Sequence, residues 1–535
     1  MLPNKETITI EFKSDRKGLS DRSLVEEVVA MSNSEGGTIF IGVEDDGTPS
    51  GAKKEHLDID GLRAVIANLT FPSVFVDAQI IEENGFPIIK VEVSPSPFIV
   101  STSSGKTLQR RLRFDGTPEM KPLYPYEFES RRSYLGQVDP SKSSTFPYEE
   151  SLIDHSTLIR AKRFIETNNG ADKSLLELSD KEFLSSIDAV FLDEKAKVRI
   201  TLAGLLLFGK NEAIKRLYPN ASFAFQRLDG DKVLQNDEDC LNVLEAFDAF
   251  VAFISKFNYN DEYIFEMTRR DVPFFDLNAL REAFANAIAH RDYAIMDPIR
   301  VTYDGTGLTI FNPGTLIRGL CPTGLITAAP RGRNPLLSAS LKRLGLCERT
   351  GRGVDRIYAS FARYGKQWPN YSMTDEYGVT IFLPRSPIDT TFAGFIATRK
   401  PNINPLPLIS LSYIRRVKKA NLNQISASTS IEIERVKADL EELQKEGIIK
   451  KDGELYSLSG ISDGITDVKI SSEEAILQIL SLAKSRSEGI TSNDVQSFLG
   501  IGGDKAHYLL KKALEKNILR VEGKLKYTRY YPANK

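Results

Sequence analysis

The sequence is poor in the residues that form metal centres and disulfide bonds. It holds three cysteines and four histidines in 535 residues, and Cys240, Cys321 and Cys347 lie far apart without a CxxC pair. A zinc site or a disulfide framework is therefore not expected. Long apolar runs are missing too, since none reaches the roughly 18 to 20 residues of a membrane-spanning helix, and the N-terminus lacks a basic segment followed by an apolar one. We expect a cytoplasmic protein without a membrane partner.

The composition is that of an ordinary folded protein. Hydrophobic residues make up 41%, charged residues 27% and aromatic residues 9%, which excludes a mainly disordered or low-complexity chain. The length of 535 residues exceeds what one hydrophobic core serves, so several domains are expected. The net charge of the chain is −2, but its charges are unevenly distributed. Residues 500–535 are basic, with nine Lys or Arg against three Asp or Glu. A polyanionic partner would therefore meet local patches rather than the whole surface.

Changes in the residue pattern divide the chain into five segments. Residues 1–120 alternate short apolar strands with turn signals around one helical stretch, which indicates an α+β module. Residues 121–384 join a connector rich in Pro, Ser and Tyr to an α/β pattern, and residues 385–407 are expected to be a proline-interrupted linker. Residues 408–460 and 470–535 share one order of helix, short helix, longer helix and two strands, which is typical of a winged helix-turn-helix. The prediction is an α+β multidomain protein with tandem winged helices.

Polar residues recur at helical spacing in the middle of the chain. Glu282, Asn286 and His290 stand at i, i+4 and i+8, so they lie on one face of a predicted helix. An Asn amide supplies the hard oxygen that Mg²⁺ bound to a triphosphate prefers, and a carboxylate one turn earlier can orient a water for attack. Three polar residues alone are also common on a solvated helix face, so the interpretation depends on the residues that follow.

A strand ending in a glycine turn, Ile310–Leu316, and a glycine-rich loop that opens a helix, Glu348–Arg356, come after this helix. Such a loop presents backbone N–H groups and a helix N-terminus to phosphate. In this order the three pieces resemble the ATP site of the GHKL superfamily. Residues 277–384 are more closely similar to its divergent AAA-4 branch, found in proteins often labelled as helicase C-terminal domains.

This resemblance implies an α/β sandwich that binds ATP with Mg²⁺. Glu282 matches the water-orienting carboxylate and Asn286 matches the magnesium ligand. Asn312 and Gly314 stand where the superfamily has an Asp-x-Gly that reads the adenine amino group, so adenine selectivity and hydrolysis stay open and any ATPase activity is expected to be weak. The cofactor-binding set is predicted to be Asn286, His290, Asn312, Gly314, Gly351, Arg352 and Gly353.

A second resemblance lies in residues 1–120. The stretches Glu6–Lys13 and Ala30–Gly47 are similar to the Schlafen/AlbA-type domain of bacterial regulators. With the segment that resembles GHKL proteins, residues 1–384 look like the bacterial Schlafen-type transcriptional regulators that end in winged helices. The resemblance implies a role in transcription regulation or in antiviral defence against mobile elements.

Arginines favour nucleic-acid binding as the role of this first module. Arg110, Arg111 and Arg113 cluster on one predicted strand, and exposed arginines there can contact successive phosphates. A purely structural interpretation is that Glu11 and Lys13 form a surface charge pair on an edge strand. We rank binding first and the charge pair second.

Carboxylates support a third interpretation of the same module, as a nuclease. Glu6 and Glu11, with Asp45 or Asp46 as the third carboxylate, are similar to the three-carboxylate site of Schlafen ribonucleases. Such a site could hold divalent ions that activate water at a phosphodiester. We rank this interpretation below the other two.

The two C-terminal units differ in charge. The predicted recognition helix of the first, Ile431–Lys445, is mostly acidic and matches DNA phosphates poorly, so packing or dimerisation is expected. The second suits duplex DNA, with its helix in the major groove and its wing along the backbone. Its basic residues are Lys505, His507, Lys511 and Lys512 on the helix and Lys524, Lys526 and Arg529 on the wing.

Together these patterns predict a DNA-binding, ATP-responsive regulator that forms a homodimer or a higher homo-oligomer. RNA is an alternative partner. Two other functions compete with this one: a metal-dependent nuclease gated by nucleotide binding, and a catalytically inactive assembly scaffold.

Overall fold

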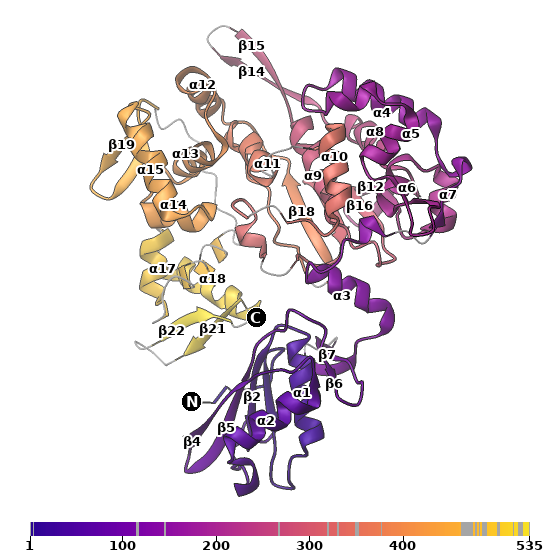
Figure 1. Cartoon of the computed structure of the whole chain (residues 1–535). Coiled ribbons are helices and arrows are strands. Elements are labelled where there is room, and N and C mark those ends of the chain that lie inside the picture. Colours follow the sequence, from indigo (N-terminus) through magenta and orange to yellow (C-terminus); the bar gives the residue numbers. More distant parts are fainter. Residues whose placement is uncertain are drawn as a thin grey trace. The chain divides into compact units, whose positions relative to one another are not determined.

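The structure is a computed structural model, and it divides into two compact units, Met1–Val138 and Asp139–Ala533 (Figure 1). Both units mix helices and strands, so the chain is an α+β multidomain protein. Among the described residues, no helix has both the length and the apolar character needed to cross a bilayer. The structure describes all residues except 1, 4, 114–116, 144–145, 266–267, 318–319, 329–330, 348–352, 376, 462–474, 477–478, 481, 484–488, 500–502, 517, 523–527 and 534–535.

A four-stranded sheet in the order β1-β2-β5-β4 organises the first unit. β1 and β2 run parallel, and the other neighbours are antiparallel. Successive side chains of a strand point to opposite faces, so Ile39 and Ile41 pack with helices α1 and α2, whereas Phe40 joins Phe12 in a smaller cluster. The elements are β1 (Ile10–Lys13), α1 (Asp21–Ser32), β2 (Gly37–Ile41), α2 (Ile59–Leu69), β4 (Asp77–Glu83) and β5 (Phe86–Val93).

One buried side chain at the end of α1 fixes the strands that follow the sheet. Asn33 Nδ2 donates to Val100 O at 2.7 Å and to Leu108 O at 2.8 Å, and its Oδ1 accepts from Val100 N at 2.8 Å. These bonds hold the start of β7 against α1. The remaining elements of the unit are β3 (Thr70–Phe71), β6 (Ser101–Thr102), β7 (Leu108–Leu112), β8 (Pro118–Pro122) and α3 (Phe128–Tyr134).

A five-stranded sheet in the order β13-β12-β16-β17-β18 lies at the centre of the second unit. Its neighbours are antiparallel except for the parallel pair β12 and β16. Phe225 of β12 contacts both Phe253 of α8 and Phe284 of α9, so these two helices lie on one face of the sheet. The elements are β12 (Phe223–Asp229), β13 (Lys232–Asp239), α8 (Val243–Ser255), α9 (Leu277–His290), β16 (Ile299–Tyr303), β17 (Gly307–Pro313) and β18 (Gly378–Pro384).

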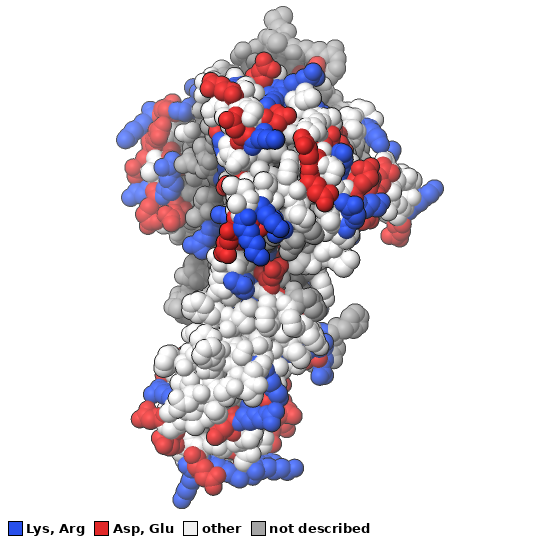
Figure 2. Space-filling view, turned by 45° about the vertical axis from the view of Figure 1, so that its right-hand side comes forward, with Lys and Arg blue, Asp and Glu red and all other residues white. Residues whose placement is uncertain are grey.

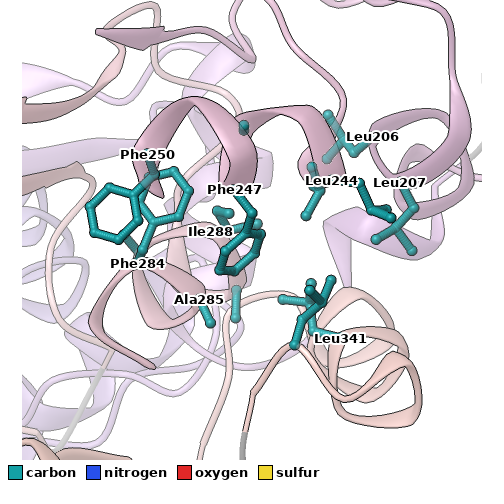
Figure 3. Packing of buried hydrophobic residues seen from close by; sticks show 14 of the residues in the cluster. Leu206, Leu207, Leu244, Phe247, Phe250, Phe284, Ala285, Ile288 and Leu341 are labelled. Carbon is teal, nitrogen blue, oxygen red and sulfur yellow. The ribbon is translucent and has the colours of Figure 1, made fainter. Parts of the chain in front are cut away.

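Helix α6 (Leu202–Phe208) is buried along its whole length and completes this core. Figure 3 shows its Leu206 and Leu207 near Leu244 of α8. Thr201 caps the helix by accepting from Gly204 N at 3.0 Å. The other elements around the core are β9 (Phe146–Pro147), α4 (His155–Thr167), α5 (Asp180–Ser186), β10 (Val190–Leu192), β11 (Val198–Ile200), α7 (Asn211–Leu217), β14 (Asn260–Phe265), β15 (Thr268–Pro273), α10 (Pro335–Leu344) and α11 (Gly353–Ala362).

The structure differs from the sequence prediction at residues 385–407, which are not a linker without regular structure. They contain helix α12 (Thr390–Arg399) and the start of α13 (Pro405–Val417). Pro405 and Pro407 fall in the first turn of α13, where a missing backbone N–H removes no intrahelical hydrogen bond. Two of the prolines that signalled a linker therefore begin a helix.

Two groups of helices, each followed by a strand pair, complete the chain. The first, residues 405–458, shares one hydrophobic core and is called the first helical unit. The second has its own core around Leu509 and Leu510, and residues 490–533 are called the second helical unit. After α13, the first helical unit contains α14 (Leu422–Thr429), α15 (Ile433–Lys445), β19 (Ile449–Asp452) and β20 (Leu455–Leu458). The second helical unit contains α17 (Ser492–Leu499), α18 (Gly503–Glu515), β21 (Leu519–Glu522) and β22 (Arg529–Pro532).

Candidate functional site

Helix α9 turns its polar stripe away from the core. On its inner side Phe284 stacks on Phe250 of α8, with ring centroids 4.4 Å apart (Figure 3). Successive helical residues are about 100° apart, so Glu282 and Asn286, each two positions from Phe284, point to the opposite side. These two residues and His290 are half-buried and line one cavity of about 700 Å³. The spacing in the sequence predicted this stripe.

The start of α11 forms the wall that faces Glu282. Gly353, its first residue, lines the same cavity, and a Cβ atom at this position would collide with Glu282 Oε1. Glycine therefore lets the loop approach the carboxylate closely. Gly351 and Arg352, also predicted for this loop, lie outside the described residues.

Strand β17 contributes Asn312 to the cavity. Its side chain is only 5% exposed, and within the described part of the chain its Oδ1 has no hydrogen-bond partner. Leaving a buried acceptor unpaired costs about 1 to 3 kcal/mol. Asn312 therefore brings an unsatisfied amide oxygen next to the cavity, although this oxygen is itself covered by protein atoms.

The electrostatic potential in the cavity is set partly by cations. Lys342 and Arg331 line it. Burial, followed by the positive charges of Arg333 and Lys342, lowers the pKa of His290 to about 4. His290 is therefore neutral near pH 7, and the positive surroundings that disfavour its protonation favour an anionic ligand. Burial and the charge of Glu282 raise the pKa of Tyr371, which lies on the same cavity.

A buried ion pair lies next to the cavity and contacts Thr315, which lines it. Arg333 Nη1 and Asp292 Oδ2 are 3.0 Å apart, with side chains 1% and 5% exposed, and Arg333 Nη2 donates to Thr315 O at 2.8 Å. Neither partner was singled out from the sequence, because they are far apart along it. Gly314 was predicted to bind the cofactor, yet it is not among the residues that line the cavity. Its φ of +102° and a hypothetical Cβ only 2.5 Å from Asp292 Cβ give it a structural role beside the pair.

Asn334 joins the end of α9 to the start of α10. Its Nδ2 donates to Ala289 O at 3.0 Å and to Arg291 O at 2.8 Å, which satisfies carbonyl groups at the end of α9. No sequence motif singled out this residue. The available signal was Pro335 directly after it, because proline favours the first position of a helix.

Arg110 of the first unit was predicted to lie on an exposed strand, but the structure buries it. Its side chain is 2% exposed, and Nη1 lies 2.6 Å from Glu11 Oε2 and 3.3 Å from Glu27 Oε2. Side chains alternate along β7, so Arg110 points inward with Leu108, while Arg111 points outward. The inward arginine is held by an ion-pair network and does not face solvent.

Lys13 completes that network, with Nζ 2.5 Å from Glu11 Oε1 and 2.9 Å from Glu27 Oε1. Burial raises the pKa of Glu11, but the charges of Lys13 and Arg110 outweigh it and the net direction is downward. Burial, with the charge of Glu11, raises the pKa of Glu27. Glu11 and Lys13 thus form a largely buried pair rather than a surface one.

The other carboxylates proposed for a nuclease lie in different settings. Glu6 Oε1 accepts from Phe12 N at 3.0 Å. Asp45 and Asp46 are exposed in a turn, where Asp46 Oδ1 accepts from Thr48 N at 2.9 Å. Within the described residues, no group of three His, Cys, Asp or Glu side chains is placed to hold a metal ion.

Helix α18 presents a basic face. Lys505, His507 and Lys511 are exposed, and Lys512 is half-buried with its Nζ 5.8 Å from the centre of the Tyr508 ring. Ala506, Leu509, Leu510 and Ala513 form the buried face of the same helix. On β22, Arg529 is exposed and donates to Gly489 O at 3.3 Å, whereas Lys524 and Lys526, predicted for a wing, lie outside the described residues.

Charges elsewhere are mixed. On the face shown in Figure 2, positive and negative side chains of the described residues are interspersed without one continuous field of a single sign. Arg111 is exposed and contacts Glu127, and Arg113 Nε is 3.0 Å from Glu119 Oε2. Both could still turn toward phosphate, because exposed ion pairs are weak.

Three family models match the chain in three separate segments. Residues 6–113 match the model described as "Schlafen, AlbA_2". Residues 140–224 match a domain of unknown function, DUF8451, and residues 298–383 match "Putative ATP-dependent DNA helicase recG C-terminal". The chain therefore carries a Schlafen/AlbA-type domain and an ATPase-like domain, which confirms these two parts of the resemblance seen in the sequence. Helix α9 lies outside the matched segments, so the roles of Glu282 and Asn286 stay predictions.

A solved structure supports the fold over the whole chain. The crystal structure of the DIP2311 protein from Corynebacterium diphtheriae aligns with a TM-score of 0.51 and 19% sequence identity, covering 98% of this chain and 94% of that chain. At this identity the likeness concerns the fold alone. None of the curated proteins gives a significant match.

Proposed function

We propose that this protein is an ATP-responsive regulator that binds DNA, and that the cavity beside α9 is its nucleotide site. The observation that carries the proposal is that Glu282, Asn286, Asn312 and Gly353, from three parts of the sequence, line one cavity of about 700 Å³. This volume lies within the roughly 300 to 1,000 Å³ typical of small-molecule sites. The five-stranded sheet with helices on one face is compatible with a GHKL-like sandwich.

Asn312 is proposed to recognise the base. Its Oδ1 lacks a partner among the described residues, and once the side chain turns toward the cavity it can accept a hydrogen bond from the exocyclic amine of adenine. Guanine presents an acceptor oxygen at the corresponding position and would leave Oδ1 unsatisfied. An amide could thus replace the aspartate that reads adenine in the GHKL superfamily.

The other end of the cavity suits the phosphates. The Asn286 amide oxygen is a hard ligand of the kind that Mg²⁺ takes alongside phosphate oxygens. Gly353 begins α11 and brings a helix N-terminus to the cavity, and Lys342 and Arg331 add positive charge. Glu282 is placed to orient a water if ATP is hydrolysed.

Calorimetry with ATP and Mg²⁺ tests the proposed site. Asn286→Ala should weaken binding about tenfold, since it removes one polar contact to the bound complex. Asn278→Ala is the matched control, because Asn278 is exposed on the same helix and does not line the cavity. Equal affinities of the wild type and Asn286→Ala would remove Asn286 from the site.

The base is tested in the same assay. Asn312→Leu should lower ATP affinity by about tenfold, because the amide acceptor is lost. The wild type should bind ATP more tightly than GTP. Preference for GTP would mean that the amide donates to the base rather than accepts from it.

The two helical units are proposed to be winged helices, and α18 is the proposed recognition helix. Replacing Lys511 and Lys512 together by Ala should weaken duplex DNA binding and reduce its log–log salt dependence by about two units, near one per lost phosphate contact. Lys437 and Lys445, both exposed on α15, provide the control pair. Titrations of labelled duplex at several salt concentrations measure both effects, and an unchanged slope would assign DNA binding to the Schlafen/AlbA-type domain.

Self-association into a homodimer belongs to this proposal, because helix-turn-helix proteins commonly bind paired half-sites as two-fold dimers. The nuclease alternative has no comparable support, since the carboxylate of Glu11 is engaged by Lys13 and Arg110.

A further inference from the structure

The first helical unit and the ATPase-like domain share one hydrophobic core. Tyr358 and Ala362 of α11, with Trp368 after it, pack in the same cluster as Leu408 and Ile414 of α13. Trp368 Nε1 lies 3.2 Å from Ser412 Oγ. Since α11 begins at the cavity with Gly353, this core adjoins the proposed nucleotide site.

Several side chains belong both to the lining of the cavity and to the shared hydrophobic core. Leu406, in the first turn of α13, lines the cavity although it belongs to the first helical unit. The residues that both line the cavity and pack against the shared core are Ile326, Val354, Tyr371 and Leu406. One wall of the cavity is therefore the surface of the first helical unit's core.

Hydrogen bonds make a second connection. Residues 320–328, called the cavity-edge segment, include five residues that line the cavity. In this segment Thr327 Oγ1 donates to Ser430 O at 3.1 Å, and Ser430 Oγ donates to Thr323 O. Ser430 has a φ of +56° and lies in the turn between α14 and α15. The turn of this helix-turn-helix is thus bound to the edge of the cavity.

We infer that the first helical unit is the transducer of the nucleotide site: it supplies a wall through Leu406 and senses the cavity-edge segment through Ser430, rather than reading DNA. This inference rests on the proposed function. A nucleotide that contacts this wall stabilises one arrangement of the unit over another, which is the differential affinity that a conformational response requires. The exposed acidic residues of α15, Glu434, Glu441 and Glu442, fit a unit that does not face DNA phosphates.

Calorimetry with ATP and Mg²⁺ on the full chain tests the wall. Leu406→Phe adds volume on the cavity side and should lower affinity about tenfold. Leu422→Phe is the matched control, since Leu422 is a half-buried leucine that packs against the same core but does not line the cavity. The control should bind as the wild type does.

Trp368 reports the response, because it is the only tryptophan in the chain and lies at the junction. Saturating ATP with Mg²⁺ should change its emission in the wild type. Ser430→Gly keeps the backbone conformation and removes the hydroxyl that holds Thr323, so it should lose most of that change. Ser430→Asn, which tolerates positive φ and keeps a donor, should retain it.

The outcomes separate the two proposals. If ATP binds but Leu406→Phe binds equally well and Trp368 emission does not respond, the inference is overturned while the nucleotide site stands. If the wild type does not bind ATP, both fall.

Discussion

Arg110→Met is expected to lower the free energy of unfolding of the first unit by about 3 kcal/mol, because removing one partner of a buried ion pair leaves an uncompensated charge. Arg110 Nη1 lies 2.6 Å from Glu11 and 3.3 Å from Glu27, and its side chain is 2% exposed. Lys13 would then face both carboxylates alone. Hydrogen exchange of the β1 and α1 amides in the full chain measures the loss.

A control variant and a control measurement test whether the loss comes from the buried ion pair. Arg113→Met should change the stability by less than about 1 kcal/mol, since Arg113 is 59% exposed in its pair with Glu119. The denaturation curve of Trp368 fluorescence should not move in either variant, because Trp368 belongs to the second unit. A stable Arg110→Met protein that has lost nucleic-acid binding would instead restore Arg110 as a phosphate contact.

Arg333→Met should destabilise the second unit by about 3 to 5 kcal/mol, for the same physical reason. The substitution removes the cation that faces Asp292, whose side chain is 5% exposed, and removes the donor to Thr315 O. Because Thr315 lines the cavity, ATP affinity should fall as well. Urea denaturation followed by Trp368 fluorescence measures the first effect, and calorimetry measures the second.

A double-mutant cycle isolates the pair. Combining Arg333→Met with Asp292→Asn should cost less than the sum of the single changes, because neither charge is then left buried alone. Arg343→Met provides the more exposed comparison, since Arg343 and Asp172 are 3.0 Å apart with side chains 34% and 28% exposed. It should cost less than about 1 kcal/mol. Strictly additive losses from the two buried changes would contradict an ion pair of this strength.

Some of the site could be predicted from local patterns. The spacing of Glu282, Asn286 and His290 placed them on one face of a helix, and the apolar residues between them placed the opposite face in the core. The same reasoning misassigned Arg110, although Leu108 two positions earlier signalled that this side of β7 is buried. The cluster of arginines suggested phosphate contacts, whereas the alternation of side chains along the strand decides which of the arginines is buried.

The prolines of residues 385–407 show a different limit. Proline interrupts a helix interior but is accepted in the first turn, and which of the two applies depends on where the helix begins. That position is set by the packing of α12 and α13 on α11, not by the prolines themselves.

By itself the sequence determined the Schlafen/AlbA-type and ATPase-like domains, the polar face of α9 and the basic face of α18, because helix and strand periodicity and short motifs are local properties. Only the tertiary structure decided that Asp292 meets Arg333, that Glu11 meets Arg110 and that Leu406 lines the cavity. These contacts join residues that are distant along the chain. The free energy of burying a charge, or of packing a side chain into the wall of a cavity, depends on neighbours that local spacing does not specify.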